Sequence, residues 1–301
     1  MLYLIDSSIY IFRGWRTLPA SIVNTHGEQA NAVQGFTETL AQILSEKNPE
    51  YIVCAFDKSA KTGTRYTIFA DYKANRTPPP QELSIQIDRC MQIASAFGVP
   101  VFSSTQVEAD DIIGSFSHTA QSEQCPVTIV SADKDLVQFI GEDDTFWHFS
   151  KKQQWNYRQL SKRFKIRPDQ LADMLALCGD KVDNIPGIPG VGPATAAKLL
   201  KKWESLDGVI DNHRAIKDMS FRGAPHVAQL IADHASTIQL SRQLTGLIVD
   251  STLPNSLEQL KRVKLDYECI VERLILAGVD KQRAEHLAHR VTQRTALDAL
   301  S

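Results

Sequence analysis

The stretch Val107-Glu108-Ala109-Asp110-Asp111-Ile112-Ile113-Gly114 organises the interpretation of this sequence. It places three carboxylates within four residues, directly before an apolar run that predicts the start of a helix. A helix would bring Glu108 and Asp111 onto one face, because residues three apart are neighbours there. Like charges packed in this way must bind a proton or find a cation. Acidic residues also favour helix N-termini through the helix dipole, so this stretch alone leaves a metal site and a simple helix start equally open.

Further acidic residues follow short apolar segments that predict buried strands. These segments are residues 2–5, 51–56 and 127–130, and Asp6, Asp57 and Asp133 come at or just after their ends. Runs this short and this rich in β-branched and aromatic residues are typical of a parallel sheet buried on both faces. Residues 99–102 predict another strand, and helical spacing recurs over residues 32–44 and 83–97. We therefore expect an α/β fold with a central, mostly parallel sheet flanked by helices.

These acids should meet in space. The carboxyl ends of parallel strands converge on one edge of a sheet, where ligands bind. Asp6, Asp57 and Asp133 would then be delivered to one crevice by separate segments. Each of them alone is equally well explained as a turn former or a helix cap. Taken together they favour a cation site, because clustered acids repel one another unless something neutralises them.

Two segments are basic and contain interleaved aromatic residues. Residues 58–81 carry five Lys or Arg against a single acid, Asp71, and indicate a basic loop or arch. Residues 145–168 carry seven Lys or Arg and no acid. This composition suits a nucleic-acid surface, although solvated loops and helix faces are the common alternative.

A glycine-rich turn occupies residues 179–193. It contributes two more carboxylates three residues apart, Asp180 and Asp183, and ends at Pro193, a favourable first residue for the helix predicted to follow. A turn of this kind presents backbone N–H groups and a positive dipole end, which suit a phosphate. We expect phosphate contacts at Gly187, Gly190, Gly192, Lys198, Lys201 and Lys202. A P-loop is excluded, because no G-x-x-x-x-G-K-[ST] occurs.

Bulk composition is that of an ordinary globular protein. The chain has 301 residues, 43% of them hydrophobic, which is enough for a full core. No segment approaches the roughly 18 apolar residues of a membrane span, and no signal peptide is apparent. The five cysteines are scattered without a C-x-x-C pair, which favours reduced thiols over disulfides or zinc. We expect a cytoplasmic protein without membrane attachment.

The order and spacing of these motifs over roughly residues 1–250 closely resemble the bacterial and phage 5′-nuclease family. That family comprises the 5′→3′ exonuclease domain of DNA polymerase I and stand-alone flap endonucleases. The matching motifs are Leu4-Ile5-Asp6, Ala55-Phe56-Asp57, Tyr72-Lys73-Ala74-Asn75-Arg76, the stretch at 108–114, Asp133-Lys134-Asp135-Leu136 and residues 179–192. The resemblance implies a PIN-like nuclease core over residues 1–168 with a helical arch at 58–81. It also implies a helical region over residues 169–280, with a helix–three-turn–helix element at about 180–202, and a C-terminal tail at 281–301.

The resemblance further implies a role for each motif. Two carboxylate clusters would bind two Mg²⁺ or Mn²⁺ ions. The first cluster would comprise Asp6, Asp57, Glu108 and Asp110, and the second Asp133, Asp135, Asp180 and Asp183, with Asp111 beside them. On the arch, Tyr72, Lys73 and Arg76 would act at the scissile phosphate. Backbone carbonyls near Leu177, Cys178, Pro186, Ile188 and Val191 match a K⁺ site that bridges to a DNA phosphate in relatives.

These roles reconcile the net charge of −2 with DNA binding. Setting nine metal-site acids aside leaves 26 of the 35 acidic residues against 33 Lys and Arg, so the remaining surface is basic.

The expected function is that of a structure-specific, metal-dependent 5′ nuclease in DNA replication and repair. It would act as a 5′→3′ exonuclease and flap endonuclease and leave 5′-phosphate and 3′-hydroxyl ends. Expected partners are branched or 5′-ended DNA, such as flaps, overhangs and gapped duplexes, with RNA-primed DNA as a further candidate. We expect a monomer that acts alone or recruits a polymerase. Two alternatives remain: a branched-DNA-binding protein with weak or no nuclease activity, and a small-RNA nuclease of the PIN type, which would lack the element at 179–202.

Overall fold

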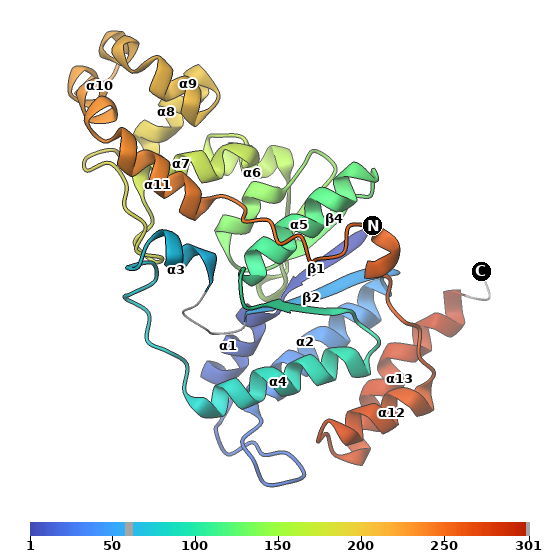
Figure 1. Ribbon diagram of the computed structural model, residues 1–301. Coiled ribbons are helices and arrows are strands. Elements are labelled where there is room, and N and C mark those ends of the chain that lie inside the picture. Colours follow the sequence, from blue (N-terminus) through green and yellow to red (C-terminus); the bar gives the residue numbers. More distant parts are fainter. Residues whose placement is uncertain (58–62, 299–301) are drawn as a thin grey trace.

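A six-stranded sheet forms the centre of the computed structural model, which describes residues 1–57 and 63–298 (Figure 1). The strand order is β3-β2-β1-β4-β5-β6. Their bounds are β1 Leu2–Asp6, β2 Tyr51–Asp57, β3 Val101–Ser104, β4 Val127–Val130, β5 Thr145–His148 and β6 Gln153–Asn156. All neighbouring pairs are parallel except β5 and β6, which are antiparallel. The expected α/β fold with a mostly parallel sheet is confirmed.

Strand register brings the predicted carboxylates to one edge. Asp6, the last residue of β1, pairs with Ala55 of β2, and Ile5 pairs with Val130, the last residue of β4. The chain therefore leaves β1 and β4 side by side. Asp57 ends β2 opposite Ser104 of β3. The carboxyl ends of three neighbouring strands thus lie at the same edge, which is where a parallel sheet binds its ligands.

Helices cover both faces of the sheet, as continuous apolar strands require. Successive strand residues point to opposite faces, so Leu4 packs in the layer of α5 (Ala109–Ser122) and Ile5 in the layer of α1 (Ser7–Thr17). The α1 layer also contains α2 (Asn31–Lys47), α4 (Gln81–Ala96), α12 (Tyr267–Leu276) and α13 (Lys281–Asp298). Figure 1 shows the two layers on either side of β1 and β2.

A mainly helical region follows β6 and extends away from the sheet (Figure 1). Its α-helices are α6 Tyr157–Phe164, α7 Leu171–Cys178, α8 Pro193–Trp203, α9 Leu206–Asp211, α10 Ala224–Asp233 and α11 Ala235–Thr245. The short 3₁₀ helices of the chain are η1 Lys134–Phe139, η2 Phe149–Lys151, η3 Pro168–Gln170, η4 His213–Asp218 and η5 Leu257–Leu260. The helix α7, the glycine-rich turns and α8 form the expected helix–three-turn–helix arrangement.

The segment interpreted as a C-terminal tail is instead folded in its described part. In α13, Ala284, Leu287, Ala288 and Val291 are buried. The guanidinium groups of Arg283 and Arg290 each lie 3.0 Å from the Glu38 carboxylate on α2. The apolar residues recur at spacings of three and four, the helical period, but the many charges between them hide this narrow stripe in the sequence.

The arch segment contains one short helix in its described part, α3 (Thr64–Ile68). The basic residues Lys58 and Lys61 of the predicted loop lie outside the described residues. None of the helices in residues 1–57 and 63–298 combines the length and the apolarity that crossing a bilayer requires.

Candidate active site

A cleft of about 770 Å³ opens at the carboxyl edge of the sheet. Its walls come from the ends of β1 and β2, from α1, from the start of α5, and from the arch. The predicted metal ligands that line it are Asp6, Asp57, Glu108, Asp110, Asp133 and Asp183. The same cleft is lined by Lys73 and Arg76 of the arch and by Arg13 and Arg16 of α1. Carboxylates from separate segments therefore share one space with four cationic side chains.

Asp6 and Asp57, at the base of the cleft, are fixed by neutral donors. The Ser131 hydroxyl donates to Asp6 Oδ2 over 2.6 Å, and the Ser8 hydroxyl donates to Asp57 Oδ2 over 2.9 Å. The backbone N–H of Ala109 donates to Asp57 Oδ1 over 2.8 Å, which ties the end of β2 to the start of α5. These bonds orient both carboxylates without cancelling their charge.

The charges in this cluster perturb one another. Burial raises the pKa of Asp6 to about 7, with the neighbouring charges of Asp57 and Asp133 adding to the rise and the Ser131 hydrogen bond opposing it. Burial and the charges of Asp133, Asp6 and Asp57 also raise the pKa of Asp110 well above its usual range. Raised pKa values mean that ionising these buried, clustered carboxyls together is costly, and a divalent cation bound there would relieve that cost.

Asp135 and Asp180 carry a different kind of partner. The Lys134 ammonium lies 2.9 Å from Asp135 Oδ1 and 3.3 Å from Asp180 Oδ2, so it bridges the two carboxylates. Burial and the Asp133 charge raise the pKa of Asp135 to about 6, although Lys134 acts against them. Burial also acts to raise the pKa of Asp180, but the Val182 N–H and Lys134 outweigh it, and the net shift is downward. Lys134 was not among the predicted site residues, although it stands between two of them in the sequence.

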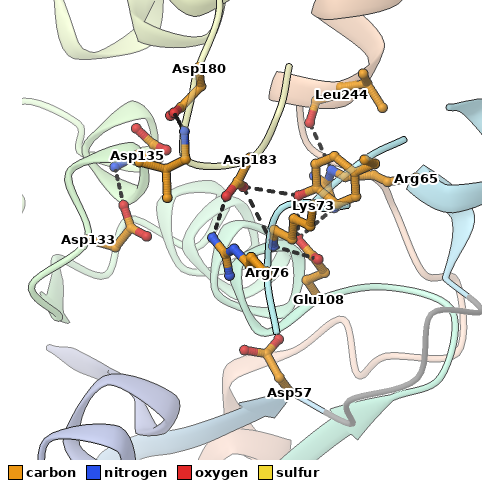
Figure 2. A network of polar contacts seen from close by, with 12 residues as sticks. Asp57, Arg65, Lys73, Arg76, Glu108, Asp133, Asp135, Asp180, Asp183 and Leu244 are labelled. Carbon is orange, nitrogen blue, oxygen red and sulfur yellow. Dashed lines mark hydrogen bonds and ion pairs between the residues drawn. The ribbon is translucent and has the colours of Figure 1, made fainter. Parts of the chain in front are cut away.

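The arch reaches the site through Tyr72, Lys73 and Arg76, of which Figure 2 labels Lys73 and Arg76. The Lys73 ammonium lies 2.7 Å from Glu108 Oε1 and 3.6 Å from Asp183 Oδ2. The Tyr72 hydroxyl lies 2.9 Å from Glu108 Oε2 and 3.2 Å from Asp183 Oδ2. The Arg76 guanidinium forms an ion pair with Asp183 Oδ1. All three predicted arch residues therefore contact predicted metal ligands.

Backbone contacts hold this part of the arch against the turn at residues 180–185. The Lys73 N–H donates to the Asp183 carbonyl over 2.9 Å. The Asn75 side chain donates to the Lys181 carbonyl over 2.9 Å, and the Asn184 side chain donates to the Asp71 carbonyl over 2.7 Å. The arch and the turn that carries Asp180 and Asp183 therefore pack directly against each other, even though they are more than a hundred positions apart in the chain.

Comparison with known families decides which class of protein carries this cleft. The model for the 5′-3′ exonuclease N-terminal resolvase-like domain matches residues 1–165, and the model for the 5′-3′ exonuclease C-terminal SAM fold matches residues 166–268. The chain belongs to the 5′-3′ exonuclease family. The family expected from the sequence motifs is thereby confirmed.

Individual relatives agree. A 5′-3′ exonuclease of Aquifex aeolicus (strain VF5) is 33% identical over 287 residues, which cover 93% of this chain and 95% of the relative. A DNA polymerase I of Rhizobium leguminosarum is 35% identical over 266 residues, or 86% of this chain but only 26% of the polymerase. The chain thus spans about a quarter of the length of the polymerase relatives that it matches.

Two solved structures share the fold of this family member. A phage T5 5′-exonuclease with bound divalent metal ions (zinc) superposes with a TM-score of 0.65 at 15% identity, covering 97% of this chain and 98% of the other. The catalytic core of Rad2 in complex with a DNA substrate superposes with a TM-score of 0.61 at 13% identity, covering 96% and 91%. At these identities the likeness shows the fold.

Asp111 was predicted to act beside the metal ligands, but in the structure its carboxylate is bound by an arginine. Asp111 is only 1% exposed, and both of its oxygens are bound by Arg65, at 2.5 and 2.8 Å. Asp111 Oδ2 also accepts the N–H of Glu108, and Oδ1 accepts the N–H of Ile248. Its carboxylate therefore anchors the arch and caps α5. Of the two explanations given for the acidic stretch, a metal site and a helix start, the helix start is the one that fits Asp111. Its oxygens accept hydrogen bonds from Arg65 and from two backbone N–H groups.

The glycine-rich turn is closely packed on its inner side. A Cβ on Gly187 would lie 2.2 Å from the Gly179 nitrogen and 2.6 Å from the Cys178 oxygen, so only glycine fits. On the outer side, Gly190 and Gly192 are exposed, as are the predicted phosphate-binding residues Lys198, Lys201 and Lys202 of α8. The turn therefore presents backbone and ammonium groups to solvent on the same element, as a phosphate contact requires.

The carbonyls predicted for K⁺ lie in these turns. The Leu177 carbonyl accepts the Ile188 N–H over 2.9 Å, and the Ile188 carbonyl accepts the Val191 N–H over 3.0 Å. The Pro186 carbonyl accepts the Ser241 hydroxyl. Each of these carbonyls keeps a second lone pair. Cys178 is the last residue of α7, and Val191 lies in the turn before α8.

The carboxylates offer the oxygen ligands that hard divalent ions prefer. Burial, and then the charges of neighbouring carboxylates, raise the pKa values of Asp6 and Asp110, so a divalent cation bound beside them would be stabilising. Within residues 1–57 and 63–298, no three His, Cys, Asp or Glu side chains converge closely enough to ligate one ion as they are placed. Several of them are instead held by Lys73, Arg76 and Lys134 (Figure 2).

Proposed function

We propose that this protein is a divalent-metal-dependent 5′ nuclease that hydrolyses DNA phosphodiesters to 5′-phosphate and 3′-hydroxyl ends. The observation that carries the proposal is one cleft in which acids from separate segments face Lys73 and Arg76 of the arch. Family membership supports it, as do relatives named 5′-3′ exonuclease. The shared fold with a nuclease solved with DNA substrate adds support. Flaps, overhangs and gapped duplexes are the proposed substrates, with RNA-primed DNA as a further candidate.

Two Mg²⁺ or Mn²⁺ ions, when bound, would supply an activated water and neutralise charge on the attacking and leaving oxygens. The first would be held by Asp6, Asp57, Glu108 and Asp110, and the second by Asp133, Asp135, Asp180 and Asp183. The protein contributes their placement. Ser131 and Ser8 orient Asp6 and Asp57 through neutral hydrogen bonds, which leave the negative charge available. Asp111 is proposed as a structural residue outside both clusters.

The arch would position and stabilise the phosphate. Lys73 and Arg76 line the cleft beside the carboxylates, so a phosphate placed there would meet two positive groups where charge develops. Tyr72 would orient Glu108 and Asp183, to which its hydroxyl is bonded. Arg65 would keep the arch in position through its buried pair with Asp111.

The helix–three-turn–helix would hold the duplex. Gly187, Gly190, Gly192 and the lysines of α8 would contact the DNA backbone without reading bases, so binding should weaken steeply with salt. K⁺ would bind the carbonyls of residues 177–191 and bridge to a phosphate. The steric need for glycine at 187 supports this element as a precisely shaped phosphate contact.

The variant Asp133→Asn tests the proposal. With a labelled 5′-flap duplex in Mg²⁺, the wild type should cleave and the variant should lose cleavage. In EDTA, where no ion is bound, the DNA affinity of the variant should stay within about threefold of the wild type, since phosphate contacts dominate binding. Cleavage by the variant at the wild-type rate would overturn the site assignment. Flap binding by a wild type that never cleaves would favour the alternative, a branched-DNA-binding protein.

A further inference from the structure

Asp183 is held by the arch on both of its oxygens. Arg76 pairs with Oδ1, while the Lys73 ammonium is 3.6 Å and the Tyr72 hydroxyl 3.2 Å from Oδ2. Figure 2 shows the Asp183 carboxylate beside Arg76 and Lys73. Asp183 is 16% exposed and Lys73 is 12% exposed, so the contacts are partly shielded from water. A divalent ion that uses Asp183 must first displace a cation of the protein itself.

The two cations on Asp183 are also the groups that a DNA phosphate would attract. Lys73 and Arg76 line the same cleft as the carboxylates. Arg76 is 49% exposed, which leaves its guanidinium free to turn toward a phosphate. The arch backbone need not move, because the Lys73 N–H stays bonded to the Asp183 carbonyl. Only the ends of long side chains have to change partner.

Asp6 and Asp57 differ in this respect. Their hydrogen bonds come from Ser131, Ser8 and the Ala109 N–H, which are neutral. In the described part of the chain neither residue forms an ion pair with Lys or Arg. An ion that uses Asp6 and Asp57 therefore competes there only with protons and weak dipoles, and it meets one cation of the protein, Lys73, at Glu108. An ion that uses Asp183 competes with two positive charges, Lys73 and Arg76.

We infer that Lys73 and Arg76 form a phosphate-released lock on Asp183, so that DNA binding raises the affinity of the second carboxylate cluster for a divalent ion. A phosphate draws the two cations off Asp183 and frees its oxygens for the ion. By thermodynamic reciprocity, an ion at that cluster raises DNA affinity by the same factor. The lock rests on the proposed function, and it delays assembly of the full metal site until substrate is in place.

Mn²⁺ titration without DNA provides the first test, with free Mn²⁺ followed by its electron paramagnetic resonance signal. The variant Arg76→Met removes the pair with Asp183. The control Arg16→Met removes an equal charge from the same cleft, where Arg16 is exposed. The Kd of the weaker Mn²⁺ site should fall about tenfold in Arg76→Met relative to Arg16→Met, within the usual range for coupled sites. Equal Kd values in the two variants would overturn the lock.

A second titration adds a 5′-flap duplex in an Asp57→Asn background, in which the proposed function predicts no cleavage. Mn²⁺ bound by the DNA alone is subtracted. The duplex should tighten Mn²⁺ binding about tenfold when Arg76 is present and by less than twofold in Arg76→Met. Equal tightening with and without Arg76 would also overturn the lock. Failure of the proposed function would look different, because the wild-type protein would then cleave no flap in Mg²⁺.

Discussion

Arg65 and Asp111 form a buried bidentate ion pair that joins the arch to the start of α5. The pair is 7% and 1% exposed. Arg65 also donates to the Leu244 and Gly246 carbonyls at the end of α11, each over 2.8 Å. One guanidinium therefore ties three separate segments together behind the active-site cleft. This explains why one acid of the 108–111 cluster differs in role from its neighbours.

Substitutions at Asp110 and Asp111 should change stability in opposite directions. Asp111→Asn leaves the buried Arg65 without its counter-charge and should cost about 3–5 kcal/mol of unfolding free energy. Asp110→Asn removes a like-charge repulsion and should raise the unfolding free energy by about 1 kcal/mol in EDTA, as at other active-site substitutions. Urea denaturation of the two variants and the wild type measures both effects.

The sign of the Asp110 effect is the discriminating result. Both substitutions remove one carboxylate charge from adjacent positions, so each serves as the control for the other. If Asp111→Asn were neutral or stabilising, the structural role given to Asp111 would be wrong. If Asp110→Asn destabilised the metal-free protein, the electrostatic description of the first cluster would fail.

Stability without metal should fall as pH rises. The folded-state pKa of Asp6 is raised from 3.8 to about 7, so between these values the folded protein holds a proton that the unfolded chain has released. The unfolding free energy therefore decreases with pH across this window. Mg²⁺ should stabilise the protein more at pH 7.5 than at pH 5, because protons compete with the ion at low pH.

Urea denaturation at several pH values, with EDTA or Mg²⁺, tests this dependence. Comparison with Asp6→Asn isolates the contribution of this carboxyl, since the variant should show a shallower decrease between pH 4 and 7 in EDTA. An identical pH profile for the variant and the wild type would contradict the assignment of the raised pKa to Asp6.

Gly187 and Gly192 offer a matched pair in the DNA-binding turn. A Cβ at Gly187 would collide with the backbone at Gly179 and Cys178, whereas a Cβ at Gly192 would meet nothing within 4 Å. Gly187→Ala should therefore cost about 1–3 kcal/mol of stability, the usual effect of overpacking, and weaken flap binding at least tenfold. Gly192→Ala should keep the wild-type stability, so a change in its flap binding would report the exposed backbone surface alone.

Fluorescence anisotropy with a labelled flap duplex measures this difference, with thermal unfolding as the check on stability. Loss of binding in both variants would indicate that the exposed backbone surface, and not the close approach at Gly187, determines the contact. Unchanged binding in Gly187→Ala would remove this turn from the DNA interface.

Short apolar runs and the position of acids after their ends predicted the sheet and the carboxylate edge. This worked because burial on both faces gives β1, β2 and β4 continuous apolar sequences. The same signal fails for β6, whose sequence Gln153-Gln154-Trp155-Asn156 is polar, because it is an exposed edge strand. Residues 145–168 were interpreted from their many charged side chains, so the β5–β6 pair was not predicted.

The partners of the acids could not be predicted from their own positions. Asp111 resembles its neighbours in sequence, and its separate role depends on Arg65, 46 positions earlier. The bridging position of Lys134 depends on Asp180 in a distant turn. In α13, the helical stripe was outweighed by the surrounding charges. Such contacts follow from tertiary packing, which brings together residues that no local pattern relates.

Cleavage of a 5′-labelled flap duplex by the wild-type protein, with and without Mg²⁺, tests the central claim most directly. The clustered acids predict products with 5′-phosphate and 3′-hydroxyl ends in Mg²⁺ and complete loss of cleavage in excess EDTA, restored when Mg²⁺ is added back. Cleavage that persists in EDTA, or intact DNA under every divalent ion tried, would contradict the claim that this acidic cleft is a metal-dependent nuclease site.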